Sequence, residues 1–204
     1  MAIRHRIMDH ALHCQQANTC FNQPLNQNKV FMLRILMLLA GLSLTACTGV
    51  PAGVKPISGF ELDRYLGTWH EIARLDHGFE RGLTEVSAEY SLRDDGGVKV
   101  MNSGYDAKEK QRRSAEGKAY FLETPDIGRL KVSFFGPFYG SYNIIALDKT
   151  AYQYVMIAGN STDYLWILAR TPKLDKAILN DLVQQAKGLG FPTQDLIYLQ
   201  PDHQ

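Results

Sequence analysis

The chain has 204 residues, with 22 Lys and Arg against 21 Asp and Glu and a formal net charge of +1. This balance excludes nucleic acid as a main partner, because a protein that binds the phosphate backbone needs a surplus of basic residues. With 45% hydrophobic and 10% aromatic residues, the chain is too apolar for a disordered protein and long enough for one globular domain. Its three Cys are too few for a disulfide framework.

The first 46 residues have the organisation of an export signal. They begin with a stretch rich in Gln and Asn that shows no apolar periodicity. Lys29 and Arg34 then flank the start of an apolar run over residues 35–44, which has the length of a signal-peptide core and is too short to span a bilayer. We therefore predict a signal peptide over residues 1–46. A normal, shorter signal would begin three residues before the apolar run, so residues 1–31 are interpreted as an upstream extension or an untypical basic region.

The signal ends in a candidate lipidation site. Residues 44–47 read Leu-Thr-Ala-Cys, which resembles the lipobox of bacterial lipoproteins. The resemblance implies that Cys47 is diacylated on sulfur, becomes the first residue after cleavage, and is then acylated on its amino group. Two or three acyl chains would hold a domain on a membrane almost permanently. Residue 48 is Thr rather than Asp, which by the same resemblance implies anchoring at the outer membrane, on the periplasmic face. The alternative is a membrane-buried Cys after an ordinary apolar stretch.

Period-two patterning dominates the chain after a Gly- and Pro-rich segment over residues 50–56. That segment is predicted to be a linker, so residues 47–58 form a lipidated N-terminus and linker, and residues 59–204 form the domain. Runs of β-branched and aromatic residues, separated by Gly, Asp, Asn and Pro turns, predict eight strands. These strands are expected over residues 69–75, 84–92, 98–105, 114–121, 129–135, 141–147, 152–158 and 164–169.

One helix and a last short strand are expected after these eight strands. The helix is predicted over residues 173–187, with Thr171 as N-cap, Pro172 in the first helical position and Gly188 at its end. The strand is predicted over residues 196–199. Sequential strands joined by short turns favour an all-β fold, an eight-stranded antiparallel up-and-down β-barrel with one C-terminal α-helix packed outside. A β-sandwich is the competing architecture.

A family resemblance enters at the first strand. Gly67 and Trp69 form a Gly-x-Trp pattern that resembles the signature of lipocalins, and Arg170 stands where lipocalins carry a basic residue that packs over the indole. The resemblance assigns a structural role to these three residues, since a guanidinium can stack on an aromatic face. The middle lipocalin signature, Thr-Asp-Tyr, is absent from its expected place at residues 148–152, and we treat the literal match at 162–164 as coincidence.

Longer runs over residues 67–83, 134–142 and 164–172 resemble the bacterial outer-membrane lipocalins, relatives of apolipoprotein D. This resemblance covers the domain and includes the lipobox. It implies a hydrophobic barrel cavity that binds fatty acids or lysophospholipids, for lipid storage or transport in envelope maintenance under stress. A lipid-anchored structural or interaction module without a ligand cavity is the alternative. Whether two copies pair as a homodimer stays open.

Candidate cavity residues follow from strand alternation and from the loops that would surround the mouth. Alternation puts Tyr164 and Trp166 on the face that leads to Arg170, which we take as the inner face. The segment from Phe135 to Tyr139 is expected at the mouth, and its rings either face lipid or fold inward to plug the cavity. The full set of cavity or mouth candidates is Met101, Phe134, Phe138, Tyr139, Tyr142, Tyr154, Met156, Tyr164 and Trp166.

A basic hairpin tip is the candidate headgroup site, and no catalytic site is expected. Lys108, Lys110, Arg112 and Arg113 fall near the same mouth, where they would hold a phosphate or carboxylate or simply form a solvated tip. The His residues after the signal, at positions 70, 77 and 203, are not spaced as metal ligands. No Cys follows Cys47. We therefore expect a binding protein rather than an enzyme, with no metal and no cofactor.

Overall fold

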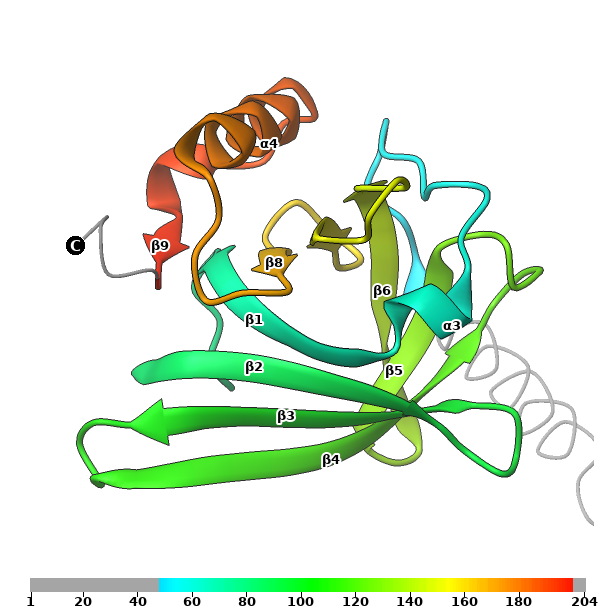
Figure 1. Cartoon of the computed structure of the whole chain (residues 1–204), viewed down its shortest axis with the longest axis horizontal. Coiled ribbons are helices and arrows are strands. Elements are labelled where there is room, and N and C mark those ends of the chain that lie inside the picture. The colour runs from blue at the N-terminus through cyan, green and yellow to red at the C-terminus, as the bar shows by residue number, and fades with distance from the viewer. Residues whose placement is uncertain (1–47, 200–204) are drawn as a thin grey trace, which may run out of the picture. The chain divides into compact units, whose positions relative to one another are not determined.

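The computed structural model describes residues 48–199, and the predicted signal peptide, Cys47 and His203 lie outside this range. Within it, a short helix α3 (Leu62–Tyr65) precedes the strands, and helix α4 (Lys176–Gly188) and the turn η2 (Thr193–Asp195) follow them (Figure 1). The strands are β1 (Gly67–Arg74), β2 (Leu83–Leu92), β3 (Val98–Asp106), β4 (Gln111–Phe121), β5 (Arg129–Phe135), β6 (Phe138–Leu147), β7 (Tyr154–Ala158), β8 (Leu165–Ala169) and β9 (Ile197–Tyr198).

The first eight strands of the described range close into an antiparallel barrel. Each strand pairs with its neighbour in sequence, and β1 pairs with both β2 and β8, so Trp69 lies opposite Ala88 while His70 lies opposite Ala169. The short β9 adds to the outer end of β1. The predicted eight-stranded up-and-down barrel is therefore confirmed and the sandwich alternative is wrong. Closure leaves no exposed edge along most of the sheet.

Two apolar cores lie on opposite sides of the barrel wall. One fills the closed end of the barrel and includes Trp69, Val155 and Ile157. The other lies between the outer wall and α4, which packs outside the barrel as predicted, and includes Met156 and Leu179 (Figure 1). Because β7 and β8 are buried on both faces, their sequences are apolar at nearly every position.

The N-cap of helix α4 lies four residues after the predicted one. Asp175 is the N-cap, and its side chain accepts hydrogen bonds from the backbone N–H groups of Ala177 and Ile178. The predicted cap, Thr171, instead bonds the carbonyl of Lys173. The helix includes Gly188, and Gly190, with φ +87°, turns the chain back toward the barrel. No helix within residues 48–199 is long and apolar enough to cross a membrane.

The segment predicted as a linker is packed on the barrel. The carbonyl of Gly49 accepts hydrogen bonds from Ser141 Oγ at 2.7 Å and Asn143 Nδ2 at 3.2 Å, both on β6. Val54 is buried in the outer core, and Ile57 exchanges backbone hydrogen bonds with the barrel, donating to the carbonyl of Ile144. The segment is therefore held against the wall at Gly49, Val54 and Ile57.

Candidate functional site

Gly67, Trp69 and Arg170 close one end of the barrel. The Arg170 guanidinium carbon lies 4.0 Å from the centroid of the Trp69 ring, and the indole N–H donates to the carbonyl of Tyr65 at 2.8 Å. Gly67 has φ +91°, and a Cβ at this position would lie 3.5 Å from the Arg170 guanidinium. The geometry matches the structural role that the signature implied, since a partly buried cation over an indole is a favourable pair.

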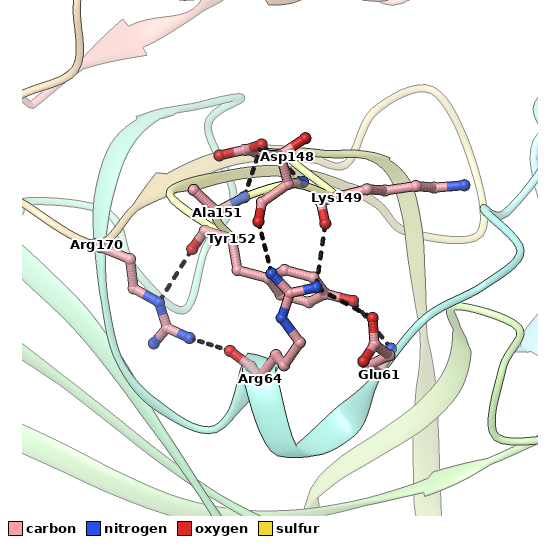
Figure 2. Close-up of polar contacts among 8 residues, drawn as sticks. Glu61, Arg64, Asp148, Lys149, Ala151, Tyr152 and Arg170 are labelled. Carbon is pink, nitrogen blue, oxygen red and sulfur yellow. Dashed lines mark hydrogen bonds and ion pairs between the residues drawn. The ribbon is translucent and has the colours of Figure 1, made fainter.

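Backbone carbonyls anchor the same guanidinium and a neighbouring one. Arg170 donates to the carbonyls of Tyr152, Thr68 and Arg64, the last at 2.7 Å. Figure 2 shows how Arg64 repeats this arrangement, donating to two carbonyls of the β6–β7 turn while its guanidinium lies 4.2 Å from the centroid of the Tyr152 ring. These contacts tie α3, the β6–β7 turn and the end of β8 into one plug.

Three Tyr hydroxyls meet above this plug and form the floor of the barrel interior. Tyr142 Oη lies 2.6 Å from Tyr65 Oη and 2.8 Å from Tyr90 Oη, so it bridges the other two. Burial raises the pKa of Tyr90 to about 12 and raises the pKa of Tyr65 and of Tyr142 well above the usual value for a Tyr. The three hydroxyls therefore stay protonated and can satisfy one another in a dry site.

An open cavity occupies the barrel between the Tyr floor and the mouth. An inner chamber of about 90 Å³ lies above Tyr90 and Tyr142, and an outer chamber of about 670 Å³ opens between the loops. The two chambers adjoin, because the side chains of Phe134 and Trp166 line both. The volume of the outer chamber falls in the range of pockets that hold small apolar ligands, about 300–1,000 Å³.

Six of the nine predicted cavity residues contribute to this wall. Their shared feature is a side chain that faces the interior or the rim: Phe134, Phe138, Tyr139, Tyr142, Tyr164 and Trp166. Phe134 lies deep in the cavity because Gly117 opposite it leaves room, where a Cβ would meet the ring at 2.8 Å. Phe135 and Phe138 extend into solvent, so the alternative in which the mouth rings plug the cavity is wrong.

The other three predicted cavity residues lie outside the barrel. Met101 pairs with Glu89 and Glu116 on the outer face of β3, because the inner positions of this strand belong to its neighbours Val100 and Asn102. Tyr154 and Met156 lie under α4 in the outer core. In each case the predicted register was wrong by one residue, which reverses the face of a strand.

A buried ionic cluster, which the sequence reasoning missed, lies in the wall of the inner chamber. Arg74 Nη1 donates to Glu71 Oε1 at 2.6 Å, and Arg74 Nη2 donates to the carbonyl of Glu80 at 2.9 Å. Glu80 Oε2 lies 3.1 Å from His77 Nε2 and accepts a hydrogen bond from Trp166 Nε1 at 3.2 Å. The carboxyl groups of Glu71 and Glu80 both line the cavity. An apolar cavity thus carries polar groups on one side.

The two carboxyl groups have different protonation behaviour. Burial, reinforced by the charge of Glu80, raises the pKa of Glu71 to about 8 against the opposing effect of Arg74. Burial also acts to raise the pKa of Glu80, but His77 and Trp166 outweigh it and the net pKa is lowered. Glu80 is therefore the carboxylate of the pair near neutral pH, and Glu71 is mostly the protonated partner.

Asn102 is a further missed residue of the cavity wall. Its Oδ1 atom is buried without a hydrogen-bond partner among residues 48–199, and the side chain lines both chambers. The sequence pattern pointed only in part to Glu71, Glu80 and Asn102 as residues of the cavity wall. Glu71 and Asn102 are polar at inward positions of strands, which alternation assigns to the outer face, and Glu80 lies in a loop where an acidic residue is ordinary.

The predicted headgroup cations divide into two groups. Arg113 lines the outer chamber, and its Nη2 atom pairs with Asp106 Oδ2 at 2.8 Å. Arg112 pairs with Glu85 on the outside. Lys108 and Lys110 are exposed in the β3–β4 turn and line neither chamber. Of the four, only Arg113 has access to the cavity.

Comparisons with known proteins agree with this geometry. The family model described as a lipocalin-like domain matches residues 60–201. Outer membrane lipoprotein Blc of Vibrio cholerae is 50% identical over 169 residues, covering 83% of this chain and 99% of the relative. The Blc protein of Escherichia coli K12 is 47% identical over 174 residues, covering 82% and 98%.

Two further matches have lower sequence identity. Rat apolipoprotein D is 31% identical over 158 residues, covering 70% of this chain and 80% of that protein. Insecticyanin from the tobacco hornworm Manduca sexta superposes with a TM-score of 0.59 at 21% identity, covering 74% of this chain and 86% of that structure, which shows a shared fold. The signature residues, the closed barrel and the matched family model together show that the chain belongs to the lipocalin family.

Proposed function

We propose that this chain is an outer-membrane-anchored lipocalin that binds a fatty acid or a lysophospholipid in its barrel cavity, for lipid storage or transport during envelope maintenance under stress. The observation that carries the proposal is the open, mostly apolar cavity in a barrel whose other end is closed by Trp69 and Arg170. A structural module without a ligand would gain stability by filling this space, since an empty apolar cavity costs free energy.

Anchoring is supported by the sequence around Cys47 and by the names of two relatives. The Leu-Thr-Ala-Cys sequence ends at Cys47, directly before the residues that pack on the barrel. The relatives from Vibrio cholerae and Escherichia coli are named outer membrane lipoproteins. Acyl chains on Cys47 would hold the domain on the membrane that supplies its ligand.

The polar groups of the cavity favour entry of the acyl chain before the headgroup, for a fatty acid and for a lysophospholipid alike. Glu71 and Glu80 line the inner chamber, so a ligand carboxylate has no unpaired cation to meet there. The acyl chain would enter first and reach toward Tyr142. The headgroup would stay in the outer chamber, where Arg113 lines the wall and a phosphate can share it with Asp106.

A blocking substitution on β4 tests whether ligand occupies the cavity. Ala115 lines the outer chamber on an exposed part of the strand, so Ala115→Trp narrows the mouth without overpacking a core. Glu116→Trp is the matched control, because Glu116 is the next residue and pairs with Lys99 on the outer face. We expect Ala115→Trp to weaken binding of a fluorescent lysophospholipid at least tenfold and Glu116→Trp to leave it unchanged.

Native mass spectrometry of the purified protein is the complementary measurement. Retained fatty acid or lysophospholipid that is lost on delipidation supports the proposal. Equal binding by both Trp variants would place the ligand elsewhere, and failure of the parent protein to bind any acyl probe at micromolar concentration would favour the structural module. In cells, loss of membrane attachment in Cys47→Ser supports the anchor, whereas unchanged recovery in the membrane fraction would refute acyl anchoring.

A further inference from the structure

Three Phe side chains project into solvent at the mouth of the barrel. Phe135 and Phe138 flank the turn between β5 and β6 and are 80% and 75% exposed, and Phe79 in the β1–β2 loop is 64% exposed. Within residues 48–199, the other exposed large apolar side chains are Leu92, at the closed end of β2, and Ile197 in β9. Exposed apolar groups gathered at one end of a protein mark a contact surface.

The segment from Gly49 to Ile57, which packs on the barrel, limits what can cover the exposed Phe side chains. Gly49 is bonded to Ser141, which lies three residues from Phe138, or about 10 Å along β6. Only Thr48 separates Gly49 from Cys47, and the Thr48 carbonyl itself accepts from Arg129 Nη2 at 3.2 Å. Arg129 begins β5 and Ser141 lies nearer the turn, so a bilayer that held acyl chains on Cys47 would be kept beside β5 and β6, with no flexible spacer between the anchor and these strands.

From the tip of the β5–β6 turn toward the barrel, the side chains change from apolar to amphipathic, in the order of the layers of a membrane. Phe135 and Phe138 form the tip, and Tyr139 and Lys131 come behind it, with Lys131 Nζ 4.8 Å from the centroid of the Tyr139 ring. Apolar rings suit the acyl boundary, whereas Tyr and Lys suit the headgroup layer, where a ring and a long cationic side chain keep their polar ends in water.

We propose that the β5–β6 turn, through Phe135 and Phe138, is a second membrane contact that inserts into the bilayer holding the acyl anchor and sets the cavity mouth against it. This inference rests on acylation of Cys47 in the proposed function. Its consequence is a route for the ligand, because an acyl chain could pass between bilayer and cavity without crossing water. Phe79 lies at the rim of that route, lining both chambers.

Quenching of single Trp reporters tests the contact in the full acylated protein. Phe138→Trp and Phe135→Trp place a reporter in the tip, and Leu92→Trp places one at the closed end as the matched control, since Leu92 is also exposed. Each variant is reconstituted in phosphatidylethanolamine and phosphatidylglycerol vesicles with and without brominated acyl chains. The parent protein supplies the background of Trp69 and Trp166, and flotation with the vesicles reports the anchor separately.

The expected result is a several-fold greater loss of added emission at residues 135 and 138 than at residue 92, in protein that floats with the vesicles. Flotation without quenching at the tip overturns the membrane contact and leaves the anchor intact. Equal quenching at residue 92 shows another orientation and also overturns it, as does a blue-shifted, unquenched tip, which would mean that a second copy covers the patch. Protein that fails to float overturns both the contact and the anchor.

Discussion

Arg170 holds its guanidinium carbon 4.0 Å from the centroid of the Trp69 indole ring while its three nitrogens donate to three backbone carbonyls. The pair joins the start of β1 to the end of β8, two strands that are far apart in sequence and adjacent in the closed barrel. The contact therefore closes the barrel at the end opposite the mouth, and its loss should destabilise the fold rather than the ligand site.

We expect Arg170→Ala to lower the free energy of unfolding by about 2–4 kcal/mol, because it removes a cation over an aromatic ring and leaves carbonyls unpaired. Arg170→Lys should recover less than half of this loss, since Lys keeps the charge but not the planar fork of donors. Urea unfolding measures both values. Lys187→Ala, an exposed cation in α4, is the control, and a loss in Arg170→Ala no larger than in this control would contradict the closing role.

The Tyr floor predicts unequal effects of similar substitutions. Tyr142 bridges two hydroxyls, whereas Tyr90 bonds one, so Tyr142→Phe leaves two buried hydroxyls without their bridge and Tyr90→Phe leaves one bond intact. We expect Tyr142→Phe to cost about 1–3 kcal/mol of unfolding free energy and Tyr90→Phe about half of that. Equal losses in urea unfolding would show that the hydroxyls do not act as a bridged set.

The raised pKa of Glu71 predicts that the free energy of unfolding falls as the pH rises. Its pKa is raised from 4.5 to about 8 in the folded protein, so between these values the folded state keeps a proton that the unfolded state has released. Stability contributed by this proton is complete below pH 4.5 and is lost as the pH rises toward 8, with a slope of about 1.4 kcal/mol per pH unit. The lowered pKa of Glu80 acts below this window and leaves the sign unchanged.

Glu71→Gln should flatten this profile, because Gln keeps an oxygen for Arg74 and has no proton to lose. The measurement is the free energy of urea unfolding at several pH values between 4.5 and 8 for the variant and its parent. Glu89→Gln, exposed on the outer face of β2, should leave the slope as in the parent. A variant and parent with parallel profiles would mean that Glu71 is ionised throughout.

The sequence predicted features that depend on chain connectivity and on short signatures. Period-two runs separated by turns were enough for eight strands, and closure followed because a barrel removes edges. The inner face of β8 was also correct, since Arg170 had to reach Trp69 and alternation then assigned Trp166 to the cavity. In this strand a named contact at one end determined the register.

The predicted register was wrong in strands where no such contact was available. Met156 and its neighbours on β7 are apolar on both faces, because one side fills the barrel and the other packs under α4, so polarity does not distinguish inside from outside. On β3 the pattern is inverted, since Met101 faces out and Asn102 faces the cavity. The cluster around Arg74 was also hidden, because its polar groups hydrogen-bond one another inside the wall, where alternation predicts apolar residues.

Asp175 and Thr171 give the last prediction, because Thr171 was the predicted N-cap of α4 and Asp175 is the observed one. Thr171 followed by Pro172 matches the common pattern at a helix start, but the helix begins only after Asp175, whose carboxylate accepts two backbone N–H groups. We expect Asp175→Ala to lower the free energy of unfolding by about 1 kcal/mol. Thr171→Ala should cost less than half of this, since its hydroxyl bonds one exposed carbonyl.

Asp175→Asn is the companion variant, since Asn caps helices about as well as Asp and should restore most of the stability. Restoration by Asn would assign the effect to the cap hydrogen bonds, whereas continued loss would assign it to the negative charge near the helix N-terminus. A larger loss in Thr171→Ala than in Asp175→Ala would contradict the observed helix start. Because Leu179 and Leu182 of this helix cover the outer wall at Met156, fraying of its first turn should also loosen that face of the barrel, which hydrogen exchange of the β7 amides would detect.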